Sequence, residues 1–166
     1  MDILIADDSP VSLKFLQKIL EGWGHHVTTC VDGGDAWHRI QDSHGSRLCI
    51  IDWDMPVMTG LEVSRKVREA KLDRYIIFLT AKDDAIDIAE GLENGADDYI
   101  CKPFRQEELQ IRLRAAIRIL NLEDQLGVPH SQTEHTASSS RSSAQGSSAQ
   151  KSSLNAPALK ATNYRM

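Results

Sequence analysis

Short apolar runs recur along the first part of the chain, and the segments between them carry apolar residues at helical spacing. Runs of this length between polar residues are typical of buried strands. They cover residues 3–6, 27–30, 48–51, 76–79 and 99–101. Strand and helix therefore alternate five times, which predicts an α/β domain with a parallel sheet covered on both faces.

The segment after the first run has the start signals of a helix. Val11, Phe15 and Ile19 recur at helical spacing. Ser9 is placed as the N-cap and Pro10 at the first helical position. Further helices are expected over residues 34–42, 61–70, 83–93 and 106–126. With right-handed crossovers, these elements predict a doubly wound, flavodoxin-like sheet of five strands in the order 2-1-3-4-5.

The last predicted helix carries two apolar stripes. One stripe suits packing against a sheet and consists of Leu109, Leu113, Ala116, Ile117 and Leu120. The other is spaced 4-3-4 like a heptad seam and consists of Ala115, Ile119, Leu122 and Leu126. The second stripe either completes the packing of the helix or extends a dimer of the domain.

Composition changes near Gly127. Residues 1–127 hold 23 acidic and 15 basic side chains, whereas residues 128–166 hold one acidic and four basic side chains. The second part includes SSSRSSAQGSSAQKSS, which cannot bury enough apolar surface to order itself. We expect one domain over residues 1–122, and a helix end with a disordered tail over residues 123–166. The alternative is that this segment is a linker left after an output domain, or sequence added for expression.

Net charge and cysteine content indicate the cellular compartment of the protein. The net charge of −5 speaks against non-specific binding to nucleic acid or to anionic membranes. Cys30, Cys49 and Cys101 lie far apart in apolar runs, without a disulfide framework or zinc spacing. No apolar run approaches the roughly 20 residues that span a bilayer, and no signal peptide is evident. These features predict a cytoplasmic protein.

The predicted strands end in charged or hydroxyl side chains. Asp7 and Asp8 follow the first strand, Asp52 the third, Thr80 the fourth and Lys102 the fifth. In a doubly wound sheet, ligands bind beyond the carboxyl ends of the strands, where the strand order reverses. The fold would therefore gather these groups at one edge.

Three carboxylates and one ammonium leave a residual charge of −2 at this edge. Two like charges about 4 Å apart repel by roughly 4 kcal/mol at an effective dielectric near 20. Such a cluster favours a divalent cation, and carboxylates that leave room for waters and a phosphate suit Mg²⁺. Asp52 could then act as a nucleophile toward phosphorus, with Lys102 and Thr80 binding the transferring oxygens.

At this point the sequence resembles the receiver domain of two-component response regulators, over about residues 1–122. Asp7-Asp8 resembles the acidic pair of that family, Asp52 its phosphoacceptor, and DMPVMTG the loop that follows. Thr80-Ala81 resembles the switch hydroxyl and its small neighbour. GADDYICKPF resembles the closing signature, with the switch aromatic Tyr99 and the pair Lys102-Pro103, whose peptide bond is usually cis.

The resemblance implies that a histidine kinase or a phosphotransfer protein phosphorylates Asp52. It implies Mg²⁺ bound directly by Asp8 and Asp52, through water by Asp7, and by the backbone carbonyl of Asp54. Phosphorylation would draw Thr80 inward and let Tyr99 follow. The chain would be no enzyme beyond its own Mg²⁺-dependent phosphorylation and dephosphorylation.

The face formed by helix four, strand five and helix five would then change its binding partners. The partner would be a downstream protein, a missing output domain or a second copy of the chain. Direct nucleic-acid binding is not expected, because no basic patch with interleaved aromatics is present. Three residues depart from the family pattern: Trp53 is bulky, and Asp54 and Lys82 are charged where the family tunes phosphoryl lifetime.

Two alternative interpretations assign the chain to other functional classes. DWDM resembles the start of the haloacid dehalogenase phosphatase signature, with Asp54 as general acid. Against it, Pro56 stands where Thr or Val is expected, and no acidic pair follows Lys102. A pseudo-receiver, folded but never phosphorylated, is the other alternative, although it predicts a missing site residue and none is missing.

Overall fold

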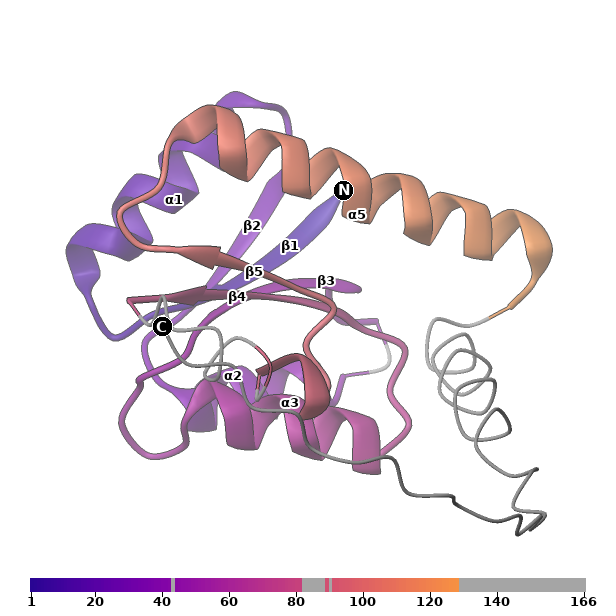
Figure 1. Ribbon diagram of the computed structural model, residues 1–166, viewed down its shortest axis with the longest axis horizontal. Coiled ribbons are helices and arrows are strands. Elements are labelled where there is room, and N and C mark those ends of the chain that lie inside the picture. Colours follow the sequence, from indigo (N-terminus) through magenta and orange to yellow (C-terminus); the bar gives the residue numbers. More distant parts are fainter. Residues whose placement is uncertain (43, 82–88, 90, 129–166) are drawn as a thin grey trace, which may run out of the picture.

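Five parallel strands form one sheet in the order β2-β1-β3-β4-β5, as predicted (Figure 1). The computed structural model describes residues 1–42, 44–81, 89 and 91–128. The strands are β1 (Asp2–Ala6), β2 (His26–Cys30), β3 (Leu48–Asp52), β4 (Tyr75–Thr80) and β5 (Asp98–Cys101). Each begins or ends within one residue of the apolar run that predicted it.

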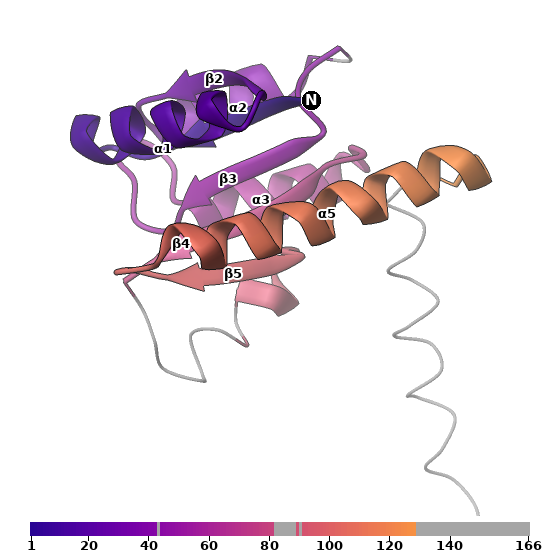
Figure 2. The ribbon, with the colours of Figure 1, turned by 90° about the horizontal axis from the view of Figure 1, so that it is seen from above.

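Helices cover both faces of the sheet. They are α1 (Pro10–Gly22), α2 (Gly33–Ile40), α3 (Gly60–Glu69) and α5 (Gln106–Leu126). α1 and α5 lie on one face, and α2 and α3 on the other (Figures 1 and 2). The predicted fourth helix, residues 83–93, falls mostly outside the described residues, as does the serine-rich segment after residue 128. Among the described helices, none is long and apolar enough to cross a membrane.

The sheet separates two apolar cores because successive side chains of a strand point to opposite faces. Ile3, Ile5 and Ile50 pack with α1 and α5. Leu4 and Cys49 pack with α2 and α3. The strand β3 is buried along its whole length, as expected for the middle of a parallel sheet. Burial also raises the pKa of the Cys49 thiol to about 12, which makes this cysteine an unreactive filler of the core.

Helix α1 turns a different stripe toward the core from the one that predicted it. Its N-cap is Ser9, whose side chain accepts from the Ser12 amide, and Pro10 is the first helical residue, as predicted. However, the buried residues are Leu13, Leu16 and Leu20, whereas Val11 and Phe15 are 79% and 46% exposed. The helix is apolar on two sides, and spacing alone did not identify the inner one.

The C-terminal part of α5 runs past the amino ends of the strands and is tied to the domain there (Figure 1). The guanidinium of Arg47, just before β3, binds Asp73 Oδ2 at 2.8 Å and pairs with Asp124. Glu123 is 6% exposed, and its Oε2 lies 3.6 Å from Arg47 Nη2. The last turns of α5 are therefore part of the packed unit.

Gly60, the first residue of α3, permits a close approach between that helix and β3. A Cβ placed there would lie 2.3 Å from the carbonyl oxygen of Asp52, a distance that requires backbone movement. Gly22 at the end of α1 has no neighbour within 4 Å of such a Cβ. The two glycines form a matched pair of test positions.

We expect Gly60→Ala to lower the free energy of unfolding by about 2–3 kcal/mol, since overpacking at a rigid contact forces the backbone apart. Gly22→Ala should be neutral or should add up to about 1 kcal/mol, because alanine is the better helix former. Urea unfolding of both variants measures these changes. Equal effects of the two substitutions would contradict the close contact at Gly60.

Candidate functional site

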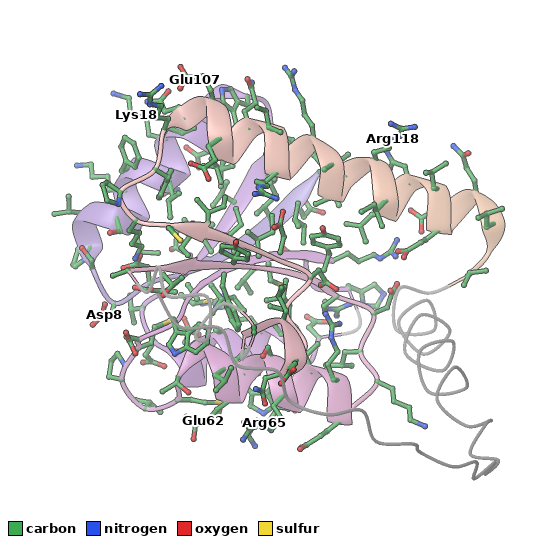
Figure 3. All side chains as sticks on the ribbon, in the orientation of Figure 1. Asp8, Lys18, Glu62, Arg65, Glu107 and Arg118 are labelled. Carbon is green, nitrogen blue, oxygen red and sulfur yellow. The ribbon has the colours of Figure 1, made fainter. Side chains whose placement is uncertain are left out.

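The charged strand ends meet at the carboxyl edge of the sheet, where β1 and β3 lie side by side. Asp7 and Asp8 follow β1, Asp52 ends β3, and Lys102 follows β5. The register pairs Ala6 of β1 with Ile51 of β3, so both strands reach this edge at the same level. Figure 3 shows Asp8 at this end of the sheet, beside the turn from β1 into α1.

Lys102 joins two buried carboxylates. Its Nζ donates to Asp7 Oδ2 and to Asp52 Oδ2, each at 2.8 Å. Asp7 is fully buried and Asp52 is 9% exposed. The other oxygen of Asp7 accepts from the amide of Ser9 at 2.8 Å, which links the site to the cap of α1. The ammonium thus holds β1 and β3 together across their ends.

The backbone that carries Lys102 is fixed on both sides. Its amide donates to the carbonyl of Thr80 at 2.6 Å, which continues the ladder between β4 and β5. The peptide bond between Lys102 and Pro103 is cis. The side chain then spans β4 to reach β3 and β1, two and three strands away from β5 in the sheet.

The electrostatic environment opposes ionisation of Asp52. Burial raises the pKa of the Asp52 carboxyl, and the charge of Asp7 raises it further, whereas the bond to Lys102 lowers it; the net direction is upward. Burial alone would lower the pKa of Lys102, but its hydrogen bonds to Asp52 and Asp7 outweigh burial and raise it. At Asp52 the effect of burial therefore outweighs that of the ammonium.

The carboxylates form a group that fits a hard cation. One oxygen from each of Asp7, Asp8 and Asp52 lies within 4.8 Å of the others, the one such group of three acidic, histidine or cysteine ligands among the described residues. Asp8 is exposed, so one side of the group is open to water and to a phosphorylated molecule. Oxygen ligands, partial hydration and uncompensated negative charge are the conditions that suit Mg²⁺.

The remaining predicted site residues lie around this group. Thr80 ends β4 and is buried, whereas Ala81 after it is exposed. Tyr99 on β5 is partly buried and packs against the core beneath α2 and α3. Asp54 is exposed, and Lys82 lies outside the described residues.

Trp53 is not placed where its bulk would cover the acceptor. It is 5% exposed, and its ring centroid lies 5.2 Å from that of Phe78. Gly91 provides room for it, because a Cβ there would come within 2.7 Å of the indole. Trp53 is therefore a residue of the core beneath α2 and α3, not an exposed side chain beside the acceptor.

The sequence analysis missed an apolar rim beside Lys102. Phe15 of α1 and Phe104 lie with their ring centroids 6.4 Å apart. A shallow cavity of about 230 Å³ lies between them and the pair Lys102-Pro103. The sequence did contain an indication of this rim: α1 has an exposed apolar stripe that includes Val11 and Phe15, in addition to its buried one. A helix that is buried on one side only does not need a second apolar stripe.

Comparisons with known proteins agree with this geometry. Residues 3–114 match the family described as response regulator receiver domain. The chain is 39% identical over 116 residues to the DNA-binding response regulator MtrA of Mycolicibacterium smegmatis, covering 70% of this chain and 50% of that protein. It is 42% identical over 116 residues to the response regulator ArlR of Staphylococcus aureus, covering 70% and 52%. The chain thus spans about half the length of these relatives.

Solved structures show the same fold. The receiver domain of the Francisella response regulator 1452 superimposes with a TM-score of 0.68 at 31% identity, covering 72% of this chain and 98% of that one. The chemotaxis protein CheY4 of Vibrio cholerae gives a TM-score of 0.64 at 31% identity, covering 69% and 97%. These matches go against the phosphatase alternative. The chain belongs to the response regulator receiver family, the signalling modules of two-component systems.

Proposed function

We propose that Asp52 accepts a phosphoryl group from a histidine kinase or phosphotransfer protein, in a reaction that requires Mg²⁺. The observation that carries this proposal is the bridge from Lys102 to Asp7 and Asp52, because it gathers the acceptor, a counter-charge and an acidic group at one open edge. Asp8, Asp52 and the backbone carbonyl of Asp54 would hold the metal directly, and Asp7 through water.

In the proposed reaction a carboxylate oxygen of Asp52 attacks phosphorus, and the bond from phosphorus to the donor breaks. The donor leaves with the electron pair of that bond, so a mixed anhydride forms on Asp52. Mg²⁺ supplies positive charge to the transferring oxygens when it is bound. The ammonium of Lys102 already lies 2.8 Å from Asp52, and it would bind one of these oxygens.

The readout of the modification involves the neighbouring strands. Thr80, the last residue of β4, and Ala81 after it would contact the phosphoryl oxygens. We propose that Thr80 then moves inward and that Tyr99, which lies on the next strand, follows it. Asp54 and Lys82 would set the lifetime of the phosphoryl group through the access of water.

Two surfaces suit the partners of such a switch. The apolar rim of Phe15 and Phe104 lies beside Lys102, where a protein donor has to approach Asp52. The stripe of Ile119, Leu122 and Leu126 is exposed on α5 and would extend a dimer across helix four, β5 and α5. A downstream protein, or an output domain of the longer protein, would use the same face. Cytoplasmic location and the absence of direct nucleic-acid binding remain predictions for this chain.

Phosphorylation by a small donor tests the proposal directly. With acetyl phosphate and Mg²⁺, the wild type should gain the mass of one phosphoryl group, and the gain should disappear when EDTA removes the metal. Asp52→Asn should remain unmodified because an amide is a poor nucleophile. The neighbouring substitution Asp54→Asn is the matched control, since it preserves Asp52 and the backbone carbonyl of residue 54. Intact-mass spectrometry measures all four samples.

An unmodified wild type, with a normal thermal transition, would favour the pseudo-receiver alternative. Phosphorylation that persists in Asp52→Asn would place the acceptor elsewhere and would contradict the role of Lys102. Both outcomes are separable from unfolding by circular dichroism of the same samples.

Stability should change with the charge at position 52. The folded protein raises the pKa of the Asp52 carboxyl, so it binds the proton more tightly than the unfolded chain does. Raising the pH through that range therefore lowers the stability of the wild type relative to Asp52→Asn. At pH 7 without metal we expect Asp52→Asn to be more stable by about 1 kcal/mol, the usual scale for relieving a functional site.

Mg²⁺ should stabilise the wild type more than Asp52→Asn, because it compensates the negative charge of Asp52, which the variant does not have. The difference in stability between the two proteins should therefore become smaller. Thermal melting at several pH values, with EDTA and with Mg²⁺, measures the effect. A wild type that is more stable than Asp52→Asn in EDTA would show that Lys102 alone neutralises the site.

A further inference from the structure

We propose a second cation site, for a borderline divalent ion such as Zn²⁺, at the opposite end of the sheet from Asp52. A cavity of about 650 Å³ lies there between α2 and the neighbouring strands β1 and β2. Its lining includes three of the six histidines of the chain, His26, His38 and His44, together with Asp2 and Asp42. In the sequence these histidines lack metal-ligand spacing, and it is the fold that brings them together.

The two strands contribute an adjacent carboxylate and imidazole. Asp2 of β1 is paired in register with His26 of β2, so their side chains leave the same face of the sheet. That face is the one beneath α2, because Leu4, two residues after Asp2, packs in the core with Ala36 and Ile40 of that helix. Both side chains therefore start on the wall of the cavity that faces α2.

The opposite wall comes from the end of α2 and the turn after it. His38 and Asp42 are four residues apart, and the backbone stays helical at Gln41 between them, so they lie one turn apart on the same side. His44 follows, with its Nδ1 3.8 Å from Asp42 Oδ1. A carboxylate and two imidazoles thus belong to this side of the cavity lining.

Three of the candidate ligands come from exposed positions on β1, β2 and α2. Within the described part of the chain, Asp2, His26 and His38 make no side-chain hydrogen bond or ion pair, and all three are exposed. Asp35 also lines the cavity, but its Oδ1 already accepts a hydrogen bond from Arg39 Nε at 3.0 Å, so it does not belong to the proposed ligand set.

The ligands require side-chain rotation to converge on one ion. As the structure stands, the acidic group at the other edge is the one described set of three ligand atoms within 4.8 Å. Exposed side chains change rotamer on the picosecond to nanosecond scale, and the proposed ion would recruit its ligands by such rotations. The ion would then link α2 to the edge strand β2.

The donor set indicates the kind of cation. Imidazole nitrogen suits Zn²⁺, Ni²⁺ and Cu²⁺, whereas Mg²⁺ is bound through oxygen. The cavity also lies roughly 16 Å from the acidic group along β1, given about 3.3 Å per residue in a strand. The two sites are therefore distinct in place and in chemistry, and the proposal does not depend on phosphorylation of Asp52.

Isothermal titration calorimetry with Zn²⁺ alone, on the full chain freed of metal, tests the proposal. We expect one saturable site at the cavity, and His26→Asn and His38→Asn should each weaken it at least tenfold. Both residues are exposed, so the variants should fold like the wild type, which thermal melting without metal verifies. Zn²⁺ should also raise the melting temperature of the wild type and not that of the double variant.

Two controls separate this cavity from other ligands of the chain. His130→Asn combined with His135→Asn removes the histidines beyond residue 128, and Asp8→Asn alters the acidic group at the other edge. Neither should change the affinity of the cavity for Zn²⁺. Absence of saturable Zn²⁺ binding, or unchanged binding in the His26→Asn/His38→Asn double variant, would overturn the proposal.

Discussion

An excess of buried negative charge at one edge of the sheet is the constraint on which the site depends. Asp7 is fully buried, Asp52 is nearly so, and Asp8 stands beside them with an oxygen within 4.8 Å of both. Lys102 binds two of the three carboxylates and still leaves the pKa of Asp52 raised. Such an arrangement is costly for a fold unless function requires it. Oxygen ligands, the remaining negative charge and an open side are the conditions that suit a divalent cation.

The rest of the fold brings these groups together and holds them. The strand order places β1 next to β3, and Lys102 directly follows β5, so its ammonium comes from the same edge. The amide of Ser9 fixes Asp7 while the side chain of the same residue caps α1. At Gly60, helix α3 touches the backbone of Asp52 itself. The helices on both faces thus begin at the site, and their positions are coupled to it.

Much of this arrangement followed from the sequence. Parallel strands buried on both faces read as apolar runs, and the capping residues identified the start of α1, so elements and topology were predictable. The group at the carboxyl edge was predictable because a doubly wound sheet brings strand ends together. The inner side of α1 was not, since Val11-Phe15-Ile19 and Leu13-Leu16-Leu20 are both helical stripes and tertiary packing selects one.

Contacts between distant segments of the chain also could not be predicted from the sequence. Arg47 pairs with Glu123 and Asp124 across the domain, and nothing in local spacing relates these residues. The same holds for His26 and His38, which come from a strand and a helix and meet at one cavity. Lys82 and the fourth helix fall outside the described residues, so the parts of the switch that they would supply remain predictions.

The claim that charge imbalance governs the site is tested most directly by Mg²⁺ affinity in Lys102→Met. This substitution removes the ammonium but keeps the length of the side chain, so the residual charge of the carboxylates becomes more negative. Calorimetric titration should show Mg²⁺ binding several-fold more tightly than in the wild type, with Asp8→Asn binding more weakly. Equal or weaker binding in Lys102→Met would contradict the account, because it would mean that uncompensated charge is not what recruits the cation.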